Sequence, residues 1–132
     1  MSLSSSFPAV LLVDDDPAVL SALSAGLSGV ATLHTATSGE DALRWLLAGG
    51  RADAIVTDHR MAEMTGLELL AQAHVLAPSA RLALHTGDPA VTVLLQPGGC
   101  LTLFGKPARL DALRGFVLGG AQACAAARVP PR

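Results

Sequence analysis

Five short apolar runs recur along this chain, with helix-like segments between them. The runs lie at residues 9–13, 31–36, 53–57, 81–85 and 100–104. Residues 10–13 and 54–56 are continuously apolar, without alternating polar positions, which is typical of strands covered on both faces. The alternation of strands and helices therefore predicts a single doubly wound α/β fold, in which a five-stranded parallel sheet lies between two layers of helices.

Four amphipathic segments supply the expected helices, at residues 17–27, 38–50, 66–78 and 109–127. Pro17 suits a first helical turn, and Ser38 followed by Asp41 is similar to a capping box. The weak member is the stretch from residue 88 to 99, where Pro97 leaves little room for another helix. The stripes expected to be buried are Leu20, Leu23 and Leu27 in the first helix, Leu67, Leu70 and His74 in the third, and Leu110, Leu113, Phe116 and Val117 in the last.

The length of 132 residues fits one domain with one substantial core. We expect a flexible N-terminal segment at residues 1–8, a folded domain at 9–126, and a tail or linker start at 127–132. The nine basic residues form no basic run, and the net charge is -2, which argues against direct nucleic acid binding by this domain. The uncharged stretches are too short to span a membrane, there is no secretory signal, and the two cysteines form no disulfide framework. These features favour a soluble cytoplasmic protein.

Polar residues with chemical potential follow four of the five predicted strands. Because right-handed crossovers send the carboxyl ends of parallel strands to one edge of the sheet, these residues are expected to share a crevice. They are Asp14, Asp15 and Asp16 after the first strand, Asp58 after the third, Thr86 after the fourth and Lys106 after the fifth.

Such a crevice calls for a cation. Carboxylates about 4 Å apart repel one another by roughly 4 kcal/mol per pair at an effective dielectric near 20. Oxygen ligands suit Mg²⁺, which is satisfied by one or two carboxylates together with phosphate oxygens. The pattern indicates phosphoryl chemistry with Asp58 as a nucleophile, Thr86 as a hydrogen-bond donor and Lys106 as an ion-pair partner of the phosphoryl group. Lys106 is the only lysine in the chain, which hints that a compact ammonium is needed there.

The stretches LLVDDDP, DAIVTDHRMAEMTGLELL, LALHTGD and LFGKPARLDAL resemble, in order and spacing, the four motif blocks of receiver domains of two-component response regulators. The resemblance extends over residues 10–117. It implies the flavodoxin-like strand order 2-1-3-4-5 and a phosphoryl group taken from a sensor histidine kinase or phosphotransfer protein. It also implies signalling by conformational change to a possible effector domain or protein, and no catalysis beyond the domain's own phosphorylation and dephosphorylation.

The same resemblance assigns roles to individual residues. Asp58 is then the phosphoacceptor, Asp15 a direct Mg²⁺ ligand and Asp14 a ligand through water. The metal set is completed by Asp58 and the main-chain carbonyl of Arg60. Thr86 and Lys106 become the switch hydroxyl and the phosphate-pairing lysine. Asp16, beside Pro17, is expected to cap the first helix instead of binding metal.

Some positions tune or depart from the family pattern. His59 is expected to border the site and to give it pH sensitivity, and Asp88, with Arg60, is expected to influence the lifetime of the aspartyl phosphate. Receivers usually carry an aromatic residue three places before the lysine, but here that place holds Leu103. Because neighbouring residues of a strand face opposite sides, Phe104 cannot substitute for it.

Two alternatives remain open from the sequence. Asp14-Xaa-Asp16 is similar to the opening motif of haloacid-dehalogenase-type phosphatases, in which Asp14 would be the nucleophile. The chain is also compatible with a degenerate receiver that serves only as a binding module.

Overall fold

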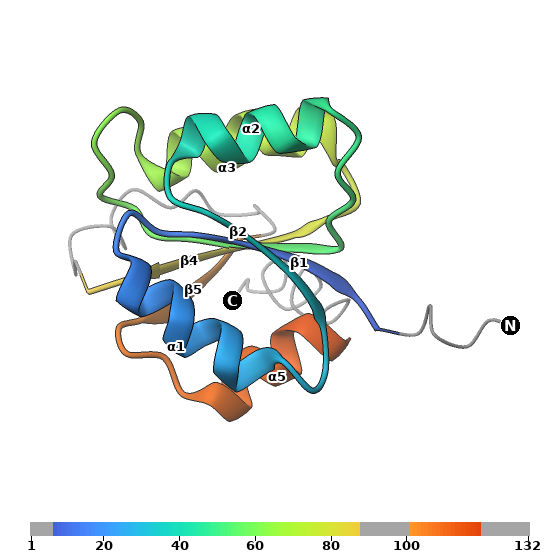
Figure 1. Ribbon diagram of the computed structural model, residues 1–132, viewed down its shortest axis with the longest axis vertical. Helices are drawn as coiled ribbons and strands as arrows, with labels where there is room; N and C mark the ends of the chain where they lie inside the picture. Colours follow the sequence, from blue (N-terminus) through green and yellow to red (C-terminus); the bar gives the residue numbers. More distant parts are fainter. Residues whose placement is uncertain (1–6, 88–100, 120–132) are drawn as a thin grey trace, which may run out of the picture.

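The computed structural model describes residues 7–87 and 101–119 of the chain. Five parallel strands form one sheet in the order β2-β1-β3-β4-β5 (Figure 1). The predicted architecture and strand order are therefore confirmed. The strands are β1 (Ala9–Val13), β2 (Thr32–Ala36), β3 (Ala54–Thr57), β4 (Arg81–Thr86) and β5 (Leu101–Gly105).

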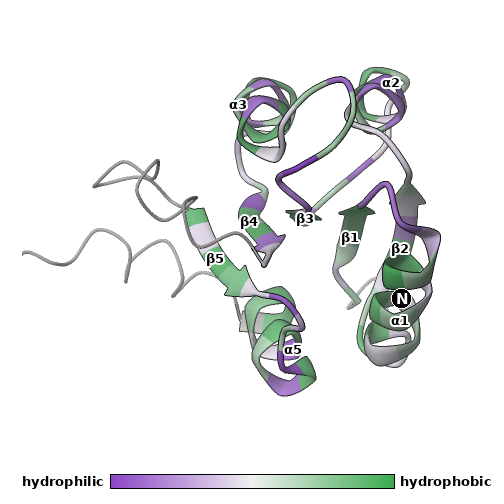
Figure 2. Ribbon diagram, turned by 90° about the vertical axis from the view of Figure 1, so that its left-hand side faces the viewer, coloured by the Kyte–Doolittle hydropathy of each residue, from purple (hydrophilic) through white to green (hydrophobic). Residues whose placement is uncertain are grey.

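Helices cover both faces of the sheet. The described helices are α1 (Pro17–Leu27), α2 (Gly39–Leu47), α3 (Gly66–Leu76) and α5 (Leu110–Gly119). Helices α2 and α3 lie on one face, and α1 and α5 lie on the other (Figures 1 and 2). None of the described helices is long and apolar enough to cross a membrane.

The core is split by the sheet into two clusters, which explains the continuously apolar strands. Leu11 and Ile55 belong to the cluster under α2 and α3, whereas Leu12 and Val56 belong to the cluster under α1 and α5. All four side chains are at most 1% exposed. Because successive side chains of a strand point to opposite faces, both faces of the central strands must be apolar.

Local signals explain where the helices begin. Asp16 precedes α1 and accepts a hydrogen bond from the backbone N–H of Ala18 at 2.9 Å, so it is the expected N-cap. Ser38 accepts from the N–H of Asp41 in the same way before α2. A reciprocal capping box joins Thr65 and Glu68 at the start of α3.

Two of the predicted stripes need correction. Helix α3 buries Leu69, Leu70 and Ala73, while His74 is exposed. The buried face of α3 is therefore centred on Leu69 and Leu70 instead of on Leu67, Leu70 and His74. Leu67 and Leu69 are both apolar, and the sequence does not show which of them faces the sheet. In α5, Leu113, Phe116 and Val117 are buried as predicted, but Leu110 is 39% exposed.

Several sequence-based expectations concern residues outside the described ranges. They include the N-terminal segment up to residue 6, the weak segment at 88–99, both cysteines (Cys100 and Cys124), and the end of the chain from residue 120. The first strand, β1, begins at Ala9.

Candidate functional site

The acidic residues predicted at one edge of the sheet lie together there. The backbone N–H of Asp58 donates to the carbonyl of Val13 at 2.9 Å, so the end of β3 is tied to the end of β1 immediately before Asp14. Asp14, Asp15 and Asp58 each offer a carboxylate oxygen within 4.8 Å of the others. The sequence therefore predicted this cluster correctly as a spatial group.

The three carboxylates differ in their surroundings. Asp14 is 1% exposed and Asp58 is 8% exposed, whereas Asp15 is open to solvent. Asp14 accepts a hydrogen bond from the N–H of Asp16 at 2.9 Å, and Asp58 accepts one from the N–H of His59 at 2.8 Å. Each buried carboxylate is thus oriented by the backbone that follows it, which leaves other oxygen lone pairs available for a cation.

Lys106 joins this cluster from the end of β5. Its Nζ atom lies 3.0 Å from Oδ2 of Asp14 and 3.5 Å from Oδ1 of Asp58. The backbone N–H of Lys106 donates to the carbonyl of Thr86 at 3.1 Å, and Thr86 pairs with Gly105 in the sheet register. Backbone pairing between β4 and β5 therefore holds Thr86 and Lys106 side by side at the same edge.

The negative charges of the acidic cluster exceed the positive charge that Lys106 supplies. Burial raises the pKa of the Asp58 carboxyl, and the nearby charge of Asp14 raises it further; Lys106 and the N–H of His59 offset only part of this. Burial by itself would lower the pKa of Lys106, but its hydrogen bond to Asp14 and the charges of Asp14 and Asp58 raise that pKa overall. One ammonium is shared between two buried carboxylates, so Asp14, Asp58 and Lys106 together carry a net negative charge when both carboxylates are ionised.

These residues fit a hard divalent cation. Three carboxylates from the ends of two adjacent strands offer oxygens within 4.8 Å of one another, and the donors are all oxygen, as Mg²⁺ prefers. The raised pKa of Asp58 shows that its negative charge is unfavourable in this place, and a cation bound among the three carboxylates would relieve that cost.

The other residues predicted for the site lie beside the acidic cluster or outside the described residues. Arg60 is exposed in the loop after β3, two residues beyond Asp58, while His59 is buried next to Asp58. Nδ1 of His59 has no hydrogen-bond partner within the described ranges. Asp88 lies outside those ranges. Asp16 caps α1 and so is separated in role from the other two acids of its run.

Leu103 and Phe104 face opposite sides of the sheet, as predicted. Leu103 packs against the cluster under α2 and α3, and Phe104 packs against the cluster under α1 and α5. The ring of Phe104 meets that of Phe116 edge-on, with centroids 5.6 Å apart. Phe104 is thus held by α5, on the opposite side of the sheet from Leu103.

Two features at the rim of the sheet could not be predicted from spacing. His85 accepts a hydrogen bond from the backbone N–H of Ala108, which lies 23 residues further along the chain. Lys106 pairs directly with Asp14, whereas the sequence predicts a phosphate-pairing role for Lys106 and a metal-binding role for Asp14. No local pattern signals either contact, because both depend on how the loop after β5 folds back over the sheet.

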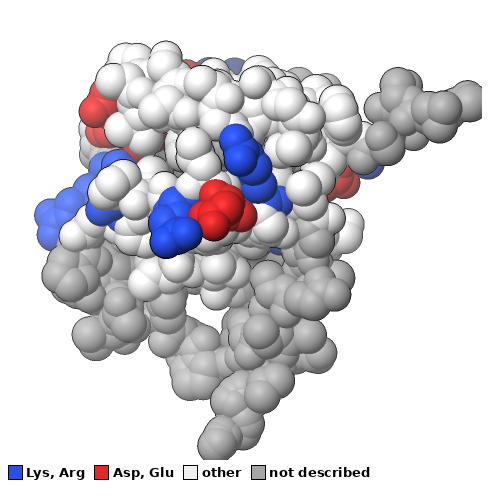
Figure 3. All heavy atoms as spheres, turned by 90° about the horizontal axis from the view of Figure 1, so that it is seen from below, with Lys and Arg blue, Asp and Glu red and all other residues white. Residues whose placement is uncertain are grey.

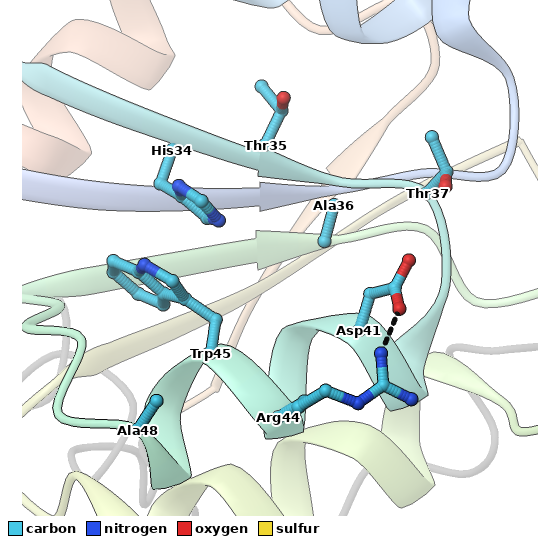
Figure 4. Close-up of a pocket in the computed structure, with 8 residues that line it drawn as sticks. All are labelled: His34, Thr35, Ala36, Thr37, Asp41, Arg44, Trp45 and Ala48. Carbon is cyan, nitrogen blue, oxygen red and sulfur yellow. Dashed lines mark hydrogen bonds and ion pairs between the residues drawn. The ribbon is translucent and has the colours of Figure 1, made fainter.

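A cavity of about 400 Å³ lies between α2 and β2, the outer strand beside β1 (Figure 4). Its wall contains His34 stacked on Trp45, with ring centroids 4.2 Å apart and planes at 7°. An ion pair between Arg44 and Asp41, both well exposed, borders it. It shares no lining residue with the acidic cluster, and the stack explains His34 as a packing residue, as predicted.

The raised pKa of Asp58 leads to a stability prediction for metal-free protein. A carboxyl whose pKa is higher in the folded than in the unfolded state stabilises the fold only while it is protonated, so stability falls as pH rises through the folded pKa. Asp58→Asn removes this charge and keeps a side-chain oxygen as acceptor for the His59 N–H. We expect it to raise the free energy of unfolding by an amount on the order of 1 kcal/mol at neutral pH, as measured by urea unfolding in a chelator, with the gain disappearing toward pH 3.

Asp111→Asn is the matched control for that prediction. Asp111 is exposed, and its hydrogen bond with Arg109 lowers the pKa of its carboxyl. The sign is therefore opposite: its contribution is present at neutral pH and lost as pH falls. An Asp58→Asn chain that is no more stable than native protein at neutral pH, or a gain that persists at pH 3, would contradict the electrostatic reading.

Comparison with known proteins agrees with the geometry. Residues 10–115 match the family described as "Response regulator receiver domain". The transcriptional regulatory protein GlrR of Escherichia coli K12 is 33% identical over 107 residues, which make up 79% of this chain but only 24% of that regulator. This chain thus spans about a quarter of the length of that curated relative.

Solved structures give the same answer. The signal receiver domain of an HD domain-containing protein from Pseudomonas fluorescens Pf-5 is 29% identical with a TM-score of 0.75, covering 96% of this chain and 93% of that one. A CheY-like receiver domain protein from Methanospirillum hungatei JF-1 shares the fold, with a TM-score of 0.78 at 22% identity over 91% of this chain and 98% of that one. With the family match extending over most of the chain, this protein belongs to the response regulator receiver domain family of two-component systems.

Proposed function

We propose that this domain accepts a phosphoryl group on Asp58 in a Mg²⁺-dependent reaction and passes the signal on by a conformational change. The observation that carries the proposal is the convergence of Asp14, Asp15, Asp58 and Lys106 at the edge where Thr86 also ends its strand. Phosphoryl transfer depends mostly on positioning and on neutralising negative charge, and these residues provide groups for both.

In the proposed reaction a carboxylate oxygen of Asp58 attacks phosphorus of a phosphohistidine. The new P–O bond forms as the P–N bond breaks, and the departing imidazole nitrogen takes up a proton from water. The product is an acyl phosphate on Asp58. One oxygen of this carboxylate is already oriented by the N–H of His59, so the carboxylate is held in place for the attack.

Asp14, Asp15, Asp58 and the main-chain carbonyl of Arg60 are the groups that we propose hold Mg²⁺. The ion, when bound, supplies positive charge beside the attacking carboxylate and the phosphoryl oxygens. The buried acids and their mutual repulsion support this assignment.

Lys106 and Thr86 are proposed to hold the phosphoryl group from the other side. The Lys106 ammonium, now between Asp14 and Asp58, exchanges part of this pairing for a phosphoryl oxygen, and the Thr86 hydroxyl donates to another. We assign the tuning of the acyl phosphate lifetime to Arg60 and Asp88, and we assign a tuning role at the border of the site to His59. The domain catalyses only its own phosphorylation and dephosphorylation in this proposal.

The partners follow from the chemistry of the site. A sensor histidine kinase or phosphotransfer protein in the cytoplasm is the proposed donor, and an effector domain or protein is the proposed recipient of the signal. GlrR is a transcriptional regulator, which supports an effector of that general kind. Direct nucleic acid binding by this domain is not part of the proposal, because on the face seen in Figure 3 the Lys and Arg atoms lie beside Asp and Glu atoms. The exposed basic side chain of Arg109 is likewise paired with an acid, Asp111.

The phosphatase alternative is disfavoured by the position of Asp16. In that reading Asp14 attacks and Asp16 assists, but the carboxylate of Asp16 accepts the Ala18 N–H as the cap of α1. Asp14, for its part, is paired with Lys106 and almost completely buried.

Intact mass after incubation with acetyl phosphate and Mg²⁺ tests the proposal. We expect the native chain to gain one phosphoryl group and Asp58→Asn to gain none, with a chelator abolishing the gain in the native chain. Asp111→Asn, which removes an exposed acid elsewhere, serves as the control and should behave as native. Equal uptake by native protein and Asp58→Asn would refute Asp58 as the acceptor, and no uptake by either would favour the binding module.

A further inference from the structure

His85 is a buried polar residue with no role in the proposed reaction. It lies in β4 with 4% of its surface exposed, on the side of the sheet that faces α1 and α5, in register with Phe104. Its Nε2 atom accepts the backbone N–H of Ala108 at 3.3 Å. Ala108 is two residues beyond Lys106, so this bond connects the strand that carries Thr86 to the loop that carries Lys106.

The hydrogen bond defines the state of the ring. A neutral imidazole that accepts at Nε2 must carry its proton on Nδ1. Burial lowers the pKa of His85, and the positive charge of Lys106 lowers it further against the opposing effect of Asp14, which favours the neutral ring that this hydrogen bond requires. Nδ1 is buried without a partner within the described residues. An apolar side chain would avoid that cost, which points to the bond at Nε2 as the reason for a histidine here.

Packing against α1 leaves a gap beside this loop, although Ala108 contacts the core cluster under α1 and α5. A cavity of about 500 Å³ lies between α1 and this loop, bordered by Val19 and Leu23 on one side and by Lys106, Pro107 and Ala108 on the other. Two hydrogen bonds hold the chain at and just after the lysine: the N–H of Lys106 donates to the carbonyl of Thr86, and the N–H of Ala108 donates to the side chain of His85. Because the lysine side chain is long and flexible, its ammonium can reach many positions. Fixing the backbone at Lys106 narrows that range.

We propose that His85 is a positioning residue, whose Nε2 atom holds the loop after β5 so that Lys106 stays within reach of Asp14 and Asp58. The expected effect on the rate of phosphoryl uptake rests on the proposed function. The expected tautomer of His85 and the expected protection of the Ala108 amide from exchange are independent of it.

Three substitutions test whether His85 acts through its hydrogen bond to Ala108 or only through the volume that its side chain fills. His85→Gln places an acceptor oxygen near the position of Nε2, His85→Asn places one near Nδ1, and His85→Leu has none. We expect His85→Leu and His85→Asn to take up phosphoryl from acetyl phosphate about tenfold more slowly than native protein, because a displaced ammonium loses its alignment. His85→Gln should remain within about threefold of native. Equal rates for the Gln and Leu variants would overturn the proposal.

NMR provides a test that needs no phosphorylation, and its first part uses the native chain alone. The ring ¹⁵N shifts of His85 are expected to show the Nδ1–H tautomer, and the Ala108 amide to exchange slowly with solvent. In folded His85→Leu the same amide should exchange at least tenfold faster, which is the effect of losing its acceptor. An Nε2–H tautomer, or unchanged Ala108 exchange in His85→Leu, would refute the tether. A native chain that shows the expected tautomer but takes up no phosphoryl group would instead refute the proposed function alone.

Discussion

Replacing Lys106 by methionine is expected to slow phosphoryl uptake at Asp58 by about two orders of magnitude, the usual cost of removing a group that stabilises transition-state charge. The ammonium lies 3.0 Å from Asp14 and 3.5 Å from Asp58, so it is the nearest cation to both buried acids among the described residues. Methionine keeps a similar length and removes only the charge. The measurement is the rate of mass gain with acetyl phosphate and saturating Mg²⁺.

The same substitution should destabilise metal-free protein by about 3 kcal/mol, because it leaves the buried carboxylate of Asp14 without its counter-ion. Added Mg²⁺ should recover part of that loss. Lys106→Arg is the matched control: it keeps the positive charge, so most of the stability should remain, while its planar fork should not restore the rate. A Met variant that reacts at the native rate would contradict the role of the ammonium, whereas an Arg variant that reacts at the native rate would contradict the need for a compact one.

The parallel sheet and the meeting of acids at one edge could be predicted because they depend on repeated, local properties, whereas the strand order was implied by the resemblance to receiver domains. Strands such as β1 and β3 are apolar on both faces, which requires helices on both sides. Once the strands are parallel, Asp14 and Asp58 must emerge at the same edge, and the chain direction leaves no other possibility. Phe104 and Leu103 could be assigned to opposite faces for an equally simple geometric reason.

The features that could not be predicted depend on how loops close in three dimensions. The pairing of Lys106 with Asp14 and the bond from Ala108 to His85 both arise where the chain turns back after β5. Their partners are 92 and 23 residues apart, and no periodicity links them. In α3 the periodicity itself was ambiguous, since apolar residues flank the buried stripe and only packing against α2 and the sheet selects Leu69 over Leu67.

Gly66→Ala is expected to lower the free energy of unfolding by about 3 kcal/mol, at the upper end of what overpacking costs. Gly66 is the first residue of α3, and its N–H donates to the carbonyl of His59 at 2.8 Å. A Cβ atom placed there would lie 2.9 Å from Cα of His59 and closer still to the carbonyl oxygen of Asp58. Backbone atoms cannot turn aside as a flexible side chain can, so α3 and the loop after β3 must separate.

Phosphoryl uptake should fall together with stability in this variant, because the loop that must move is the one that orients Asp58. Two other glycines provide matched controls. At Gly39, the first residue of α2, an added Cβ meets only the side chain of Met64, and at Gly115 in α5 it meets nothing within 4 Å. We expect Gly39→Ala to be nearly neutral, and Gly115→Ala to stabilise by about 0.5–1 kcal/mol through helix propensity. Urea unfolding of the three variants, with uptake measured under native conditions, tests this order; a Gly66→Ala chain as stable and reactive as Gly39→Ala would show that the close approach of α3 to Asp58 has no part in building the site.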